Sequence, residues 1–143
     1  MKSSNILIAK IKEFEGFRSQ AYKCPAGVWT IGYGHTADVK PEDKISEAEA
    51  ERLLRKDLIY YEAFVESLQV SQKQEKFDAL VDFAYNLGCS ALENSTLLKK
   101  IRACRPDKEI RAEFMRWVYS GKKKLPGLVT RRQWEADRYF NLV

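Results

Sequence analysis

The sequence predicts a predominantly helical α+β domain of 143 residues. Apolar residues recur at helical spacing near the N-terminus and in about five segments after residue 46. Residues 17–36 instead combine strand-forming aromatic and β-branched residues with turn-forming glycine and proline. With 45% hydrophobic and 12% aromatic residues, the chain can bury a core. We therefore expect one domain over residues 1–143, with a small sheet and a larger helical part.

The first helix is expected over residues 4–15, where a serine or asparagine near the start can cap it. Gly16 is a natural helix stop, so Glu15 stands at the predicted C-terminal end. An antiparallel sheet follows, with its turn at residues 24–27.

Five helices are expected after the sheet. Ser46 opens a capping box with Glu49 ahead of a long helix over about residues 47–66. A second box at residues 71–74 starts the next helix, which stops at Gly88. The remaining signals are a cap at Asn94-Ser95, a start at Pro106-Asp107, a stop near Gly121, a basic loop at Lys122–Lys124 and a last helix after Pro126-Gly127.

The formal net charge of +5 and the pI of about 9.1 suggest an anionic partner. Nucleic acid, phospholipid and an anionic cell-wall polymer qualify, but nothing resembles a nucleic-acid-binding module, so no nucleic acid is expected. Lys122–Lys124 and Arg131-Arg132 are interpreted as a solvated face. No apolar stretch approaches the roughly 20 residues that span a bilayer. We therefore expect no stable membrane insertion, and accumulation in the cytosol.

Three cysteines without Cys-x-x-Cys spacing, and a single histidine, argue against a zinc site. Cys89 and Cys104 are interpreted as buried or half-buried thiols, and whether they ever form a disulfide stays open.

Glu15 is the first candidate for chemistry. The negative end of the helix dipole disfavours ionisation of its carboxyl group, and Phe14 and Phe17 flank it and can help to desolvate it. A carboxyl group that stays protonated can act as a general acid. Cys24 lies nine positions after Glu15, and Thr30 six positions after Cys24. The turn between them would fold both back towards Glu15, which would place an acid and a base or nucleophile around a glycosidic bond.

The pattern Glu15-x8-Cys24-x5-Thr30, followed by residues 31–36 (IGYGHT), resembles the catalytic motif of the phage lysozymes, the endolysins. The match resumes in segments that begin at Ala84, Asn94 and Gly127, and so covers nearly the whole chain. The triad spacing together with the Gly-Tyr-Gly-His segment is the specific part of this resemblance.

The resemblance implies a muramidase that hydrolyses the β-1,4 bond between N-acetylmuramic acid and N-acetylglucosamine in peptidoglycan, for lysis of a host cell. Glu15 would be the acid, and Cys24 and Thr30 the pair on the water side. No metal or organic cofactor is implied. The implied fold is lysozyme-like. A sheet lobe (about 14–45) and a helical lobe (about 71–143 plus the N-terminal helix) flank a cleft and are joined by the long helix (about 47–66).

Family members also line the sugar cleft with an aromatic and an amide side chain, which correspond to Tyr85 and Asn86. An aromatic ring packs on a sugar, and an amide bonds to N-acetyl or hydroxyl groups. The alternatives are a core position for Tyr85 and a helix-end position for Asn86. Ser95 is either a substrate contact or a helix cap. His35, the only histidine, is predicted to pair with Asp57 and tie the sheet to the long helix.

Cys24 departs from the aspartate found in other members. A free thiol has a pKa of about 8.5 and is mostly neutral at pH 7. As a base Cys24 would give inversion, and as a nucleophile it would give retention. Two rival functions are a lytic transglycosylase on the same scaffold and a non-catalytic wall-binding module. The expected protein is a monomer that reaches the wall only after another agent releases it from the cytosol.

Overall fold

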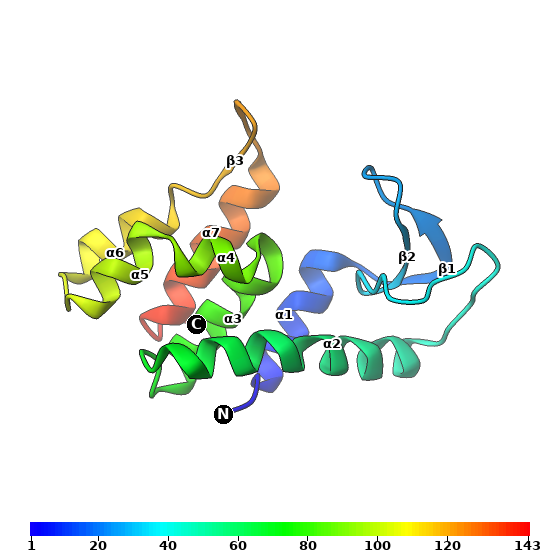
Figure 1. The fold of residues 1–143 in the computed structure, drawn as a ribbon, viewed down its shortest axis with the longest axis horizontal. Helices are drawn as coiled ribbons and strands as arrows, with labels where there is room; N and C mark the ends of the chain where they lie inside the picture. The colour runs from blue at the N-terminus through cyan, green and yellow to red at the C-terminus, as the bar shows by residue number, and fades with distance from the viewer. The chain divides into compact units, whose positions relative to one another are not determined.

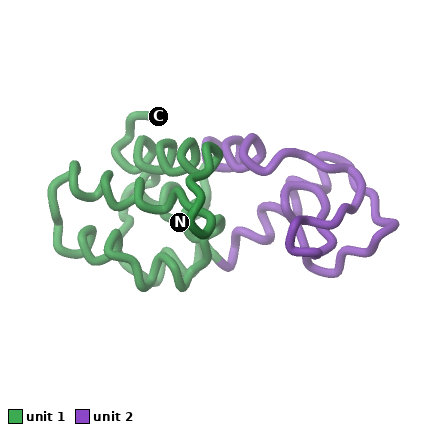
Figure 2. Tube along the Cα trace, turned by 90° about the horizontal axis from the view of Figure 1, so that it is seen from above, with its two compact units in different colours: residues 1–4, 61–143 green, residues 5–60 purple.

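The computed structural model describes residues 1–143 and confirms the predominantly helical α+β class: seven helices accompany two small antiparallel sheets (Figure 1). The chain divides into two compact units, coloured separately in Figure 2. We call Asn5–Tyr60 the hairpin unit, and Met1–Ser4 with Tyr61–Val143 the helical unit. Helix α2 (Glu47–Leu68) begins in the hairpin unit and ends in the helical unit.

Helix α1 (Asn5–Glu15) opens the hairpin unit and buries one face. It ends where predicted, because Gly16 adopts a left-handed φ of 71° and its amide donates to the Lys12 carbonyl oxygen at 2.9 Å. Glu15 is therefore the last residue of the helix. The buried side chains of α1 are Leu7, Ile8 and Ile11.

The predicted sheet is a two-stranded antiparallel hairpin of β1 (Arg18–Lys23) and β2 (Trp29–Gly32). Tyr22 lies opposite Thr30, and an irregularity lies between Arg18 and Tyr22. Such a bulge bends the strand that carries it. The turn between the strands contains Cys24, as predicted.

Gly32 ends β2 at a point of close approach to α2. Its φ is 66°, and a Cβ atom there would lie 3.1 Å from both Ala50 Cβ and Ile45 Cδ1. Backbone conformation and space both require glycine at this position. The contact seats the hairpin against the start of α2.

The predicted pairing of His35 with Asp57 is confirmed. His35 Nδ1 lies 2.7 Å from Asp57 Oδ2, and Nε2 lies 2.9 Å from the Ala37 carbonyl oxygen. Because Asp57 belongs to α2, the contact ties the segment after β2 to that helix. The Ser46 cap of α2 is also confirmed, since its Oγ accepts from the Glu49 amide at 3.2 Å.

The helical unit is built around α3 and α7. All eight residues from 77 to 84, in the middle of α3, are buried, and α3 packs against α7. The buried stretch includes Asp78 and Asp82, which form ion pairs with Arg138 and Arg131 of α7. The elements of this unit are α3 (Gln74–Leu87), α4 (Cys89–Glu93), α5 (Thr96–Arg102), α6 (Asp107–Phe114), β3 (Tyr119–Ser120), β4 (Lys123–Lys124) and α7 (Pro126–Tyr139).

Several local predictions in this unit are wrong. The box at residues 71–74 does not form, since Lys73 takes the cap position without a side-chain bond. Helix α4 was not predicted, and α6 ends at Phe114, well before Gly121. The basic loop is a β3–β4 hairpin with Gly121 in its turn at a φ of 62°.

Arg131 and Arg132 do not belong to a solvated face. Both are buried on α7, where Arg131 grips Asp82 with Nε at 3.0 Å and Nη2 at 2.8 Å. Buried charges need such partners: Asp82 of α3 pairs with Arg131, and Glu135 of α7 itself pairs with Arg132. Lys122–Lys124, by contrast, are exposed as predicted.

The three cysteines are free thiols. Cys89 is half-buried, but Cys104 is exposed, contrary to the expectation of burial. No helix is long and apolar enough to cross a membrane. No group of three or more histidine, cysteine, aspartate or glutamate side chains is placed to hold a metal ion.

Candidate active site

Three of the six predicted site residues, Glu15, Cys24 and Thr30, belong to the hairpin unit. Glu15 is half-buried at the end of α1, and β1 begins three residues later at Arg18. The positive φ of Gly16 turns the chain sharply after the carboxylate. Along the chain, the turn after α1 and the bulged strand β1 therefore lie between Glu15 and Cys24.

Cys24 sits at the mouth of the hairpin turn. Its amide donates to the Val28 carbonyl oxygen at 2.9 Å, and its carbonyl oxygen accepts from the Gly27 amide at 2.8 Å. These bonds hold residues 24–28 in one conformation. Thr30, on β2, is buried, while Cys24 is half-buried. The Thr30 hydroxyl lies within hydrogen-bonding reach of the Cys24 sulfur, so the structure brings these two residues together.

Hydrogen bonds to the sulfur lower the pKa of Cys24 below its ordinary value. The Val28 backbone amide is the largest cause, and the Ala26 amide and the Thr30 hydroxyl add to it. Partial burial acts in the opposite direction but does not prevail. Donors aimed at a sulfur favour the thiolate, which is the reactive form.

The Thr30 hydroxyl has two acceptors and one proton. It lies 3.0 Å from the Val28 carbonyl oxygen and also within reach of the Cys24 sulfur. A hydroxyl donates a single hydrogen bond. When Cys24 is ionised, the charged sulfur is the stronger acceptor, so the proton turns towards it. Thr30 therefore responds to the ionisation of Cys24.

Tyr85 and Asn86 lie near the C-terminal end of α3 in the helical unit. Both are half-buried. The Tyr85 ring meets the Tyr61 ring edge-on, with centroids 5.3 Å apart. Asn86 Oδ1 accepts from Arg132 Nη2 at 2.7 Å. Asn86 is thus a helix-end residue with a firmly bound carbonyl oxygen.

Ser95 is the N-cap of α5. Its Oγ accepts from the Leu98 amide at 3.0 Å and donates to the Leu92 carbonyl oxygen at 2.7 Å. The predicted cap is confirmed, and both functions of the hydroxyl are used inside the chain. Ser95 also lines a surface hollow of about 270 Å³, together with Asn94, Thr96, Glu113, Arg116 and Trp117. Its substrate contact stays a prediction.

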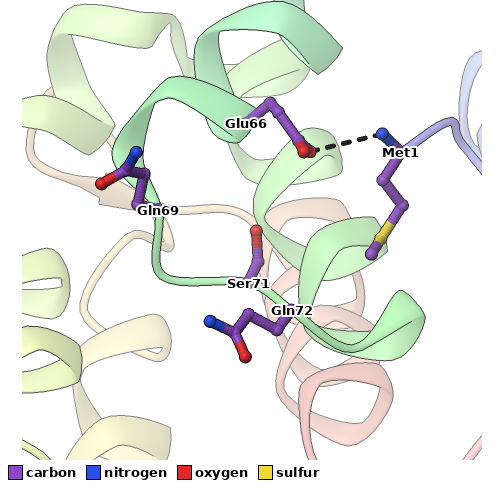
Figure 3. A pocket seen from close by; sticks show the side chains of 5 residues that line it. All are labelled: Met1, Glu66, Gln69, Ser71 and Gln72. Carbon is purple, nitrogen blue, oxygen red and sulfur yellow. Dashed lines mark hydrogen bonds and ion pairs between the residues drawn. The ribbon is translucent and has the colours of Figure 1, made fainter.

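A larger hollow of about 600 Å³ lies elsewhere on the helical unit (Figure 3). The Met1 amino group lies across it, 3.4 Å from Glu66 Oε2. None of the predicted site residues lines this hollow. Its lining residues are Met1, Glu66, Gln69, Ser71 and Gln72.

The sequence analysis missed two features of the candidate site: the amides at the Cys24 sulfur and the burial of Arg132. The backbone amides of Ala26 and Val28 carry no side-chain signature, so only the folded turn reveals that they point at the sulfur. Arg132 was assigned to a solvated face. The glutamate three residues later, Glu135, was a usable signal, because helical spacing places the two side chains on one face.

Known proteins similar to this chain are phage endolysins and related domains. The phage lysozyme family matches residues 12–135. An endolysin of Bacillus phage B103 is 46% identical over an alignment of 144 residues, which covers 98% of this chain and 54% of that protein. An endolysin of Acyrthosiphon pisum secondary endosymbiont phage 1 is 40% identical over an alignment of 130 residues, which covers 87% of this chain and 88% of that protein.

Among solved structures, the muramidase domain of SpmX from Asticaccaulis excentricus is similar, with a TM-score of 0.88. It is 34% identical, and the match covers 96% of this chain and 97% of that one. This chain spans about half the length of the Bacillus phage endolysin. The lysozyme-like fold is confirmed, and the chain belongs to the phage lysozyme family.

Proposed function

We propose that the chain is a muramidase that hydrolyses the β-1,4 bond between N-acetylmuramic acid and N-acetylglucosamine in peptidoglycan. The observation that carries the proposal is the Cys24 sulfur, held by the Val28 and Ala26 amides and the Thr30 hydroxyl at the proposed base position. Membership of the phage lysozyme family and the similarity to a solved muramidase domain support it. The proposed biological role is lysis of a host cell.

In the proposed reaction, the Glu15 carboxyl group gives its proton to the glycosidic oxygen as the bond from that oxygen to the anomeric carbon breaks. A water molecule attacks the anomeric carbon from the opposite face, and the Cys24 thiolate takes its proton. Thr30 holds that water or the sulfur. The products are two shorter glycans, and the configuration at the anomeric carbon is inverted.

A nucleophilic Cys24 is the alternative. The thiolate would then form a glycosyl–sulfur bond, which a later water hydrolyses with overall retention. We favour the base, since the Thr30 hydroxyl lies within reach of the sulfur and can hold the water whose proton the thiolate accepts. NMR of the first product anomer distinguishes the two routes.

The decisive experiment follows release of soluble fragments from purified peptidoglycan. Glu15→Gln and Cys24→Ser should each lower kcat by about 10²–10⁴-fold, because each removes one proton-transfer group. Glu13→Gln is the matched control, an exposed glutamate on the same helix that pairs only with Lys10. Full activity in Glu15→Gln would refute the assignment.

Mass spectrometry of the fragments separates a muramidase from the related lytic transglycosylase. Reducing muramic acid ends support hydrolysis, and 1,6-anhydro ends would replace it with transglycosylation. A wild-type chain that binds peptidoglycan without cutting it would be a wall-binding module. The proposal further holds that the chain acts as a monomer on glycan strands, after release from the cytosol.

A further inference from the structure

The carboxamide of Asn86 has a fixed polarity, because the group behind it can only donate. Arg132 Nη2 lies 2.7 Å from Asn86 Oδ1, and a guanidinium group carries no acceptor. The amide oxygen must therefore face Arg132, and the amide nitrogen must face away. Which way an asparagine points is often ambiguous, but here the chemistry of its partner decides it.

Arg132 has no freedom to move. Its side chain is completely buried, and Glu135 lies against it: Oε2 accepts a hydrogen bond from Nη2 at 2.8 Å, and Oε1 lies 2.7 Å from Nε in ion-pair contact without a hydrogen bond. The Trp117 carbonyl oxygen lies 3.4 Å from Nη1, and the guanidinium lies over the Phe83 ring, 5.4 Å from its centroid. Arg132 is thus clamped on several sides.

The clamp continues through a second buried pair. Glu135 shares a hydrogen bond with Asp82, and Arg131 holds Asp82 by two bonds. Both carboxylates are completely buried, and they lie on α3 and α7. These buried contacts restrict the orientation of the Arg132 guanidinium group. Arg132 therefore presents its donor to Asn86 from a rigid base.

The outward side of the carboxamide is available. Asn86 is half-buried, and its side chain forms one hydrogen bond, the one to Arg132. Its Nδ2 atom forms no hydrogen bond and is not buried, so it is accessible to solvent. The group exposed to a ligand is therefore a donor with no acceptor beside it. Such a group selects an acceptor oxygen. In a wall glycan, the carbonyl oxygen of an N-acetyl group only accepts hydrogen bonds, whereas hydroxyl groups both donate and accept them.

We propose that Arg132 is a positioning residue that turns Asn86 into an obligate hydrogen-bond donor for the carbonyl oxygen of an N-acetyl group. The inference rests on the proposed function, which makes the wall glycan the ligand. It goes further by assigning the direction of the hydrogen bond and the chemical group recognised. It also gives the Asp82–Glu135 pair a role as the support of Arg132.

Asn86→Asp is the sharpest test. Aspartate keeps an oxygen for Arg132 but replaces the outward donor with an acceptor. The variant should fold and melt at or above the wild-type temperature, since its bond to Arg132 becomes charge-assisted. Its affinity for a β-1,4-linked N-acetylglucosamine tetramer, measured by calorimetry in a Glu15→Gln background, should fall by about tenfold. Affinity for the de-N-acetylated tetramer should change much less.

A double variant tests Arg132 itself. Arg132→Gln with Glu135→Gln replaces both members of the buried pair, while Asp82 keeps its partner Arg131. Because glutamine at 132 can donate or accept, the Asn86 amide is no longer forced into one orientation. Preference for the acetylated tetramer should weaken although Asn86 is still present. Arg105→Gln with Glu109→Gln is the control, because it removes a more exposed arginine–glutamate pair of the same unit, and it should retain the preference.

Several results would overturn the inference. Binding of both tetramers by Asn86→Asp at the affinity of its parent, equal loss of both affinities, or failure to fold would each contradict a donor held by Arg132. Absence of tetramer binding by the parent would do the same. Shifts of the Asn86 side-chain amide protons on addition of the acetylated tetramer are an independent expected signal. Failure of the proposed function is distinct, since it appears as a wild-type chain that leaves peptidoglycan intact.

Discussion

Gly32→Ala should loosen the hairpin that carries Cys24 and Thr30. Two costs combine at this position. The φ of 66° places an added Cβ in the left-handed region, which costs about 1–2 kcal/mol for a residue other than glycine. The same Cβ would lie 3.1 Å from Ala50 Cβ and Ile45 Cδ1, closer than ordinary contact.

The contact cost is that of overpacking, typically about 1–3 kcal/mol. The expected loss of unfolding free energy is therefore about 2–5 kcal/mol. Gly16→Ala is the matched control in the same unit. Its φ of 71° carries the same backbone penalty, but nothing lies within 4 Å of the added Cβ. The reduced entropy of the unfolded chain is common to both variants and cancels in the comparison.

Urea unfolding followed by far-UV circular dichroism and tryptophan fluorescence measures both variants, and agreement of the two probes tests whether one transition is observed. Gly32→Ala should be less stable than Gly16→Ala by at least about 1 kcal/mol, or roughly 2–4 °C in Tm. Equal stabilities would refute the close approach of Gly32 to α2. A further loss of lytic activity is expected from Gly32→Ala, because the hairpin positions Cys24.

Three more predictions concern charges. The double-mutant cycle of His35→Ala and Asp57→Ala should give a coupling of about 1–3 kcal/mol in unfolding free energy, since the side chains lie 2.7 Å apart and are only 13% and 28% exposed; additive losses would contradict a direct interaction. Burial, together with Asp82, raises the pKa of Glu135, so the folded chain retains a proton that the unfolded chain releases near pH 4.3. The contribution of this proton to the unfolding free energy is therefore complete below about pH 4.3 and is lost as the pH rises through the folded pKa of Glu135. Glu135→Gln should flatten this fall of the unfolding free energy with pH. Parallel curves of unfolding free energy against pH for the variant and its parent would contradict the prediction. Replacing Lys122–Lys124 by glutamine should weaken binding to an anionic cell wall and reduce its salt dependence, measured by pelleting; an unchanged salt dependence would assign these lysines to solubility alone.

Local signals in the sequence determined the helices, the hairpin and the residues of its turn. Gly16 stops α1 because it alone adopts the required backbone angle cheaply, and Ser46 and Ser95 cap helices through bonds to amides three residues away. Such features depend on near neighbours in the chain. The pairing of His35 with Asp57 could also be predicted from the sequence, because the chain has a single histidine and Asp57 lies on the helix that follows it.

Only the tertiary structure decided which charges are buried and which groups they orient. Arg131 and Arg132 look like surface residues in the sequence, yet both lie in the core against carboxylates some fifty positions earlier or three later. The backbone amides on the Cys24 sulfur are equally invisible, since every residue except proline has one. The burial of both arginines and the direction of the Arg132–Asn86 hydrogen bond arise from contacts between α3 and α7, and the spacing of residues along one helix does not reveal them.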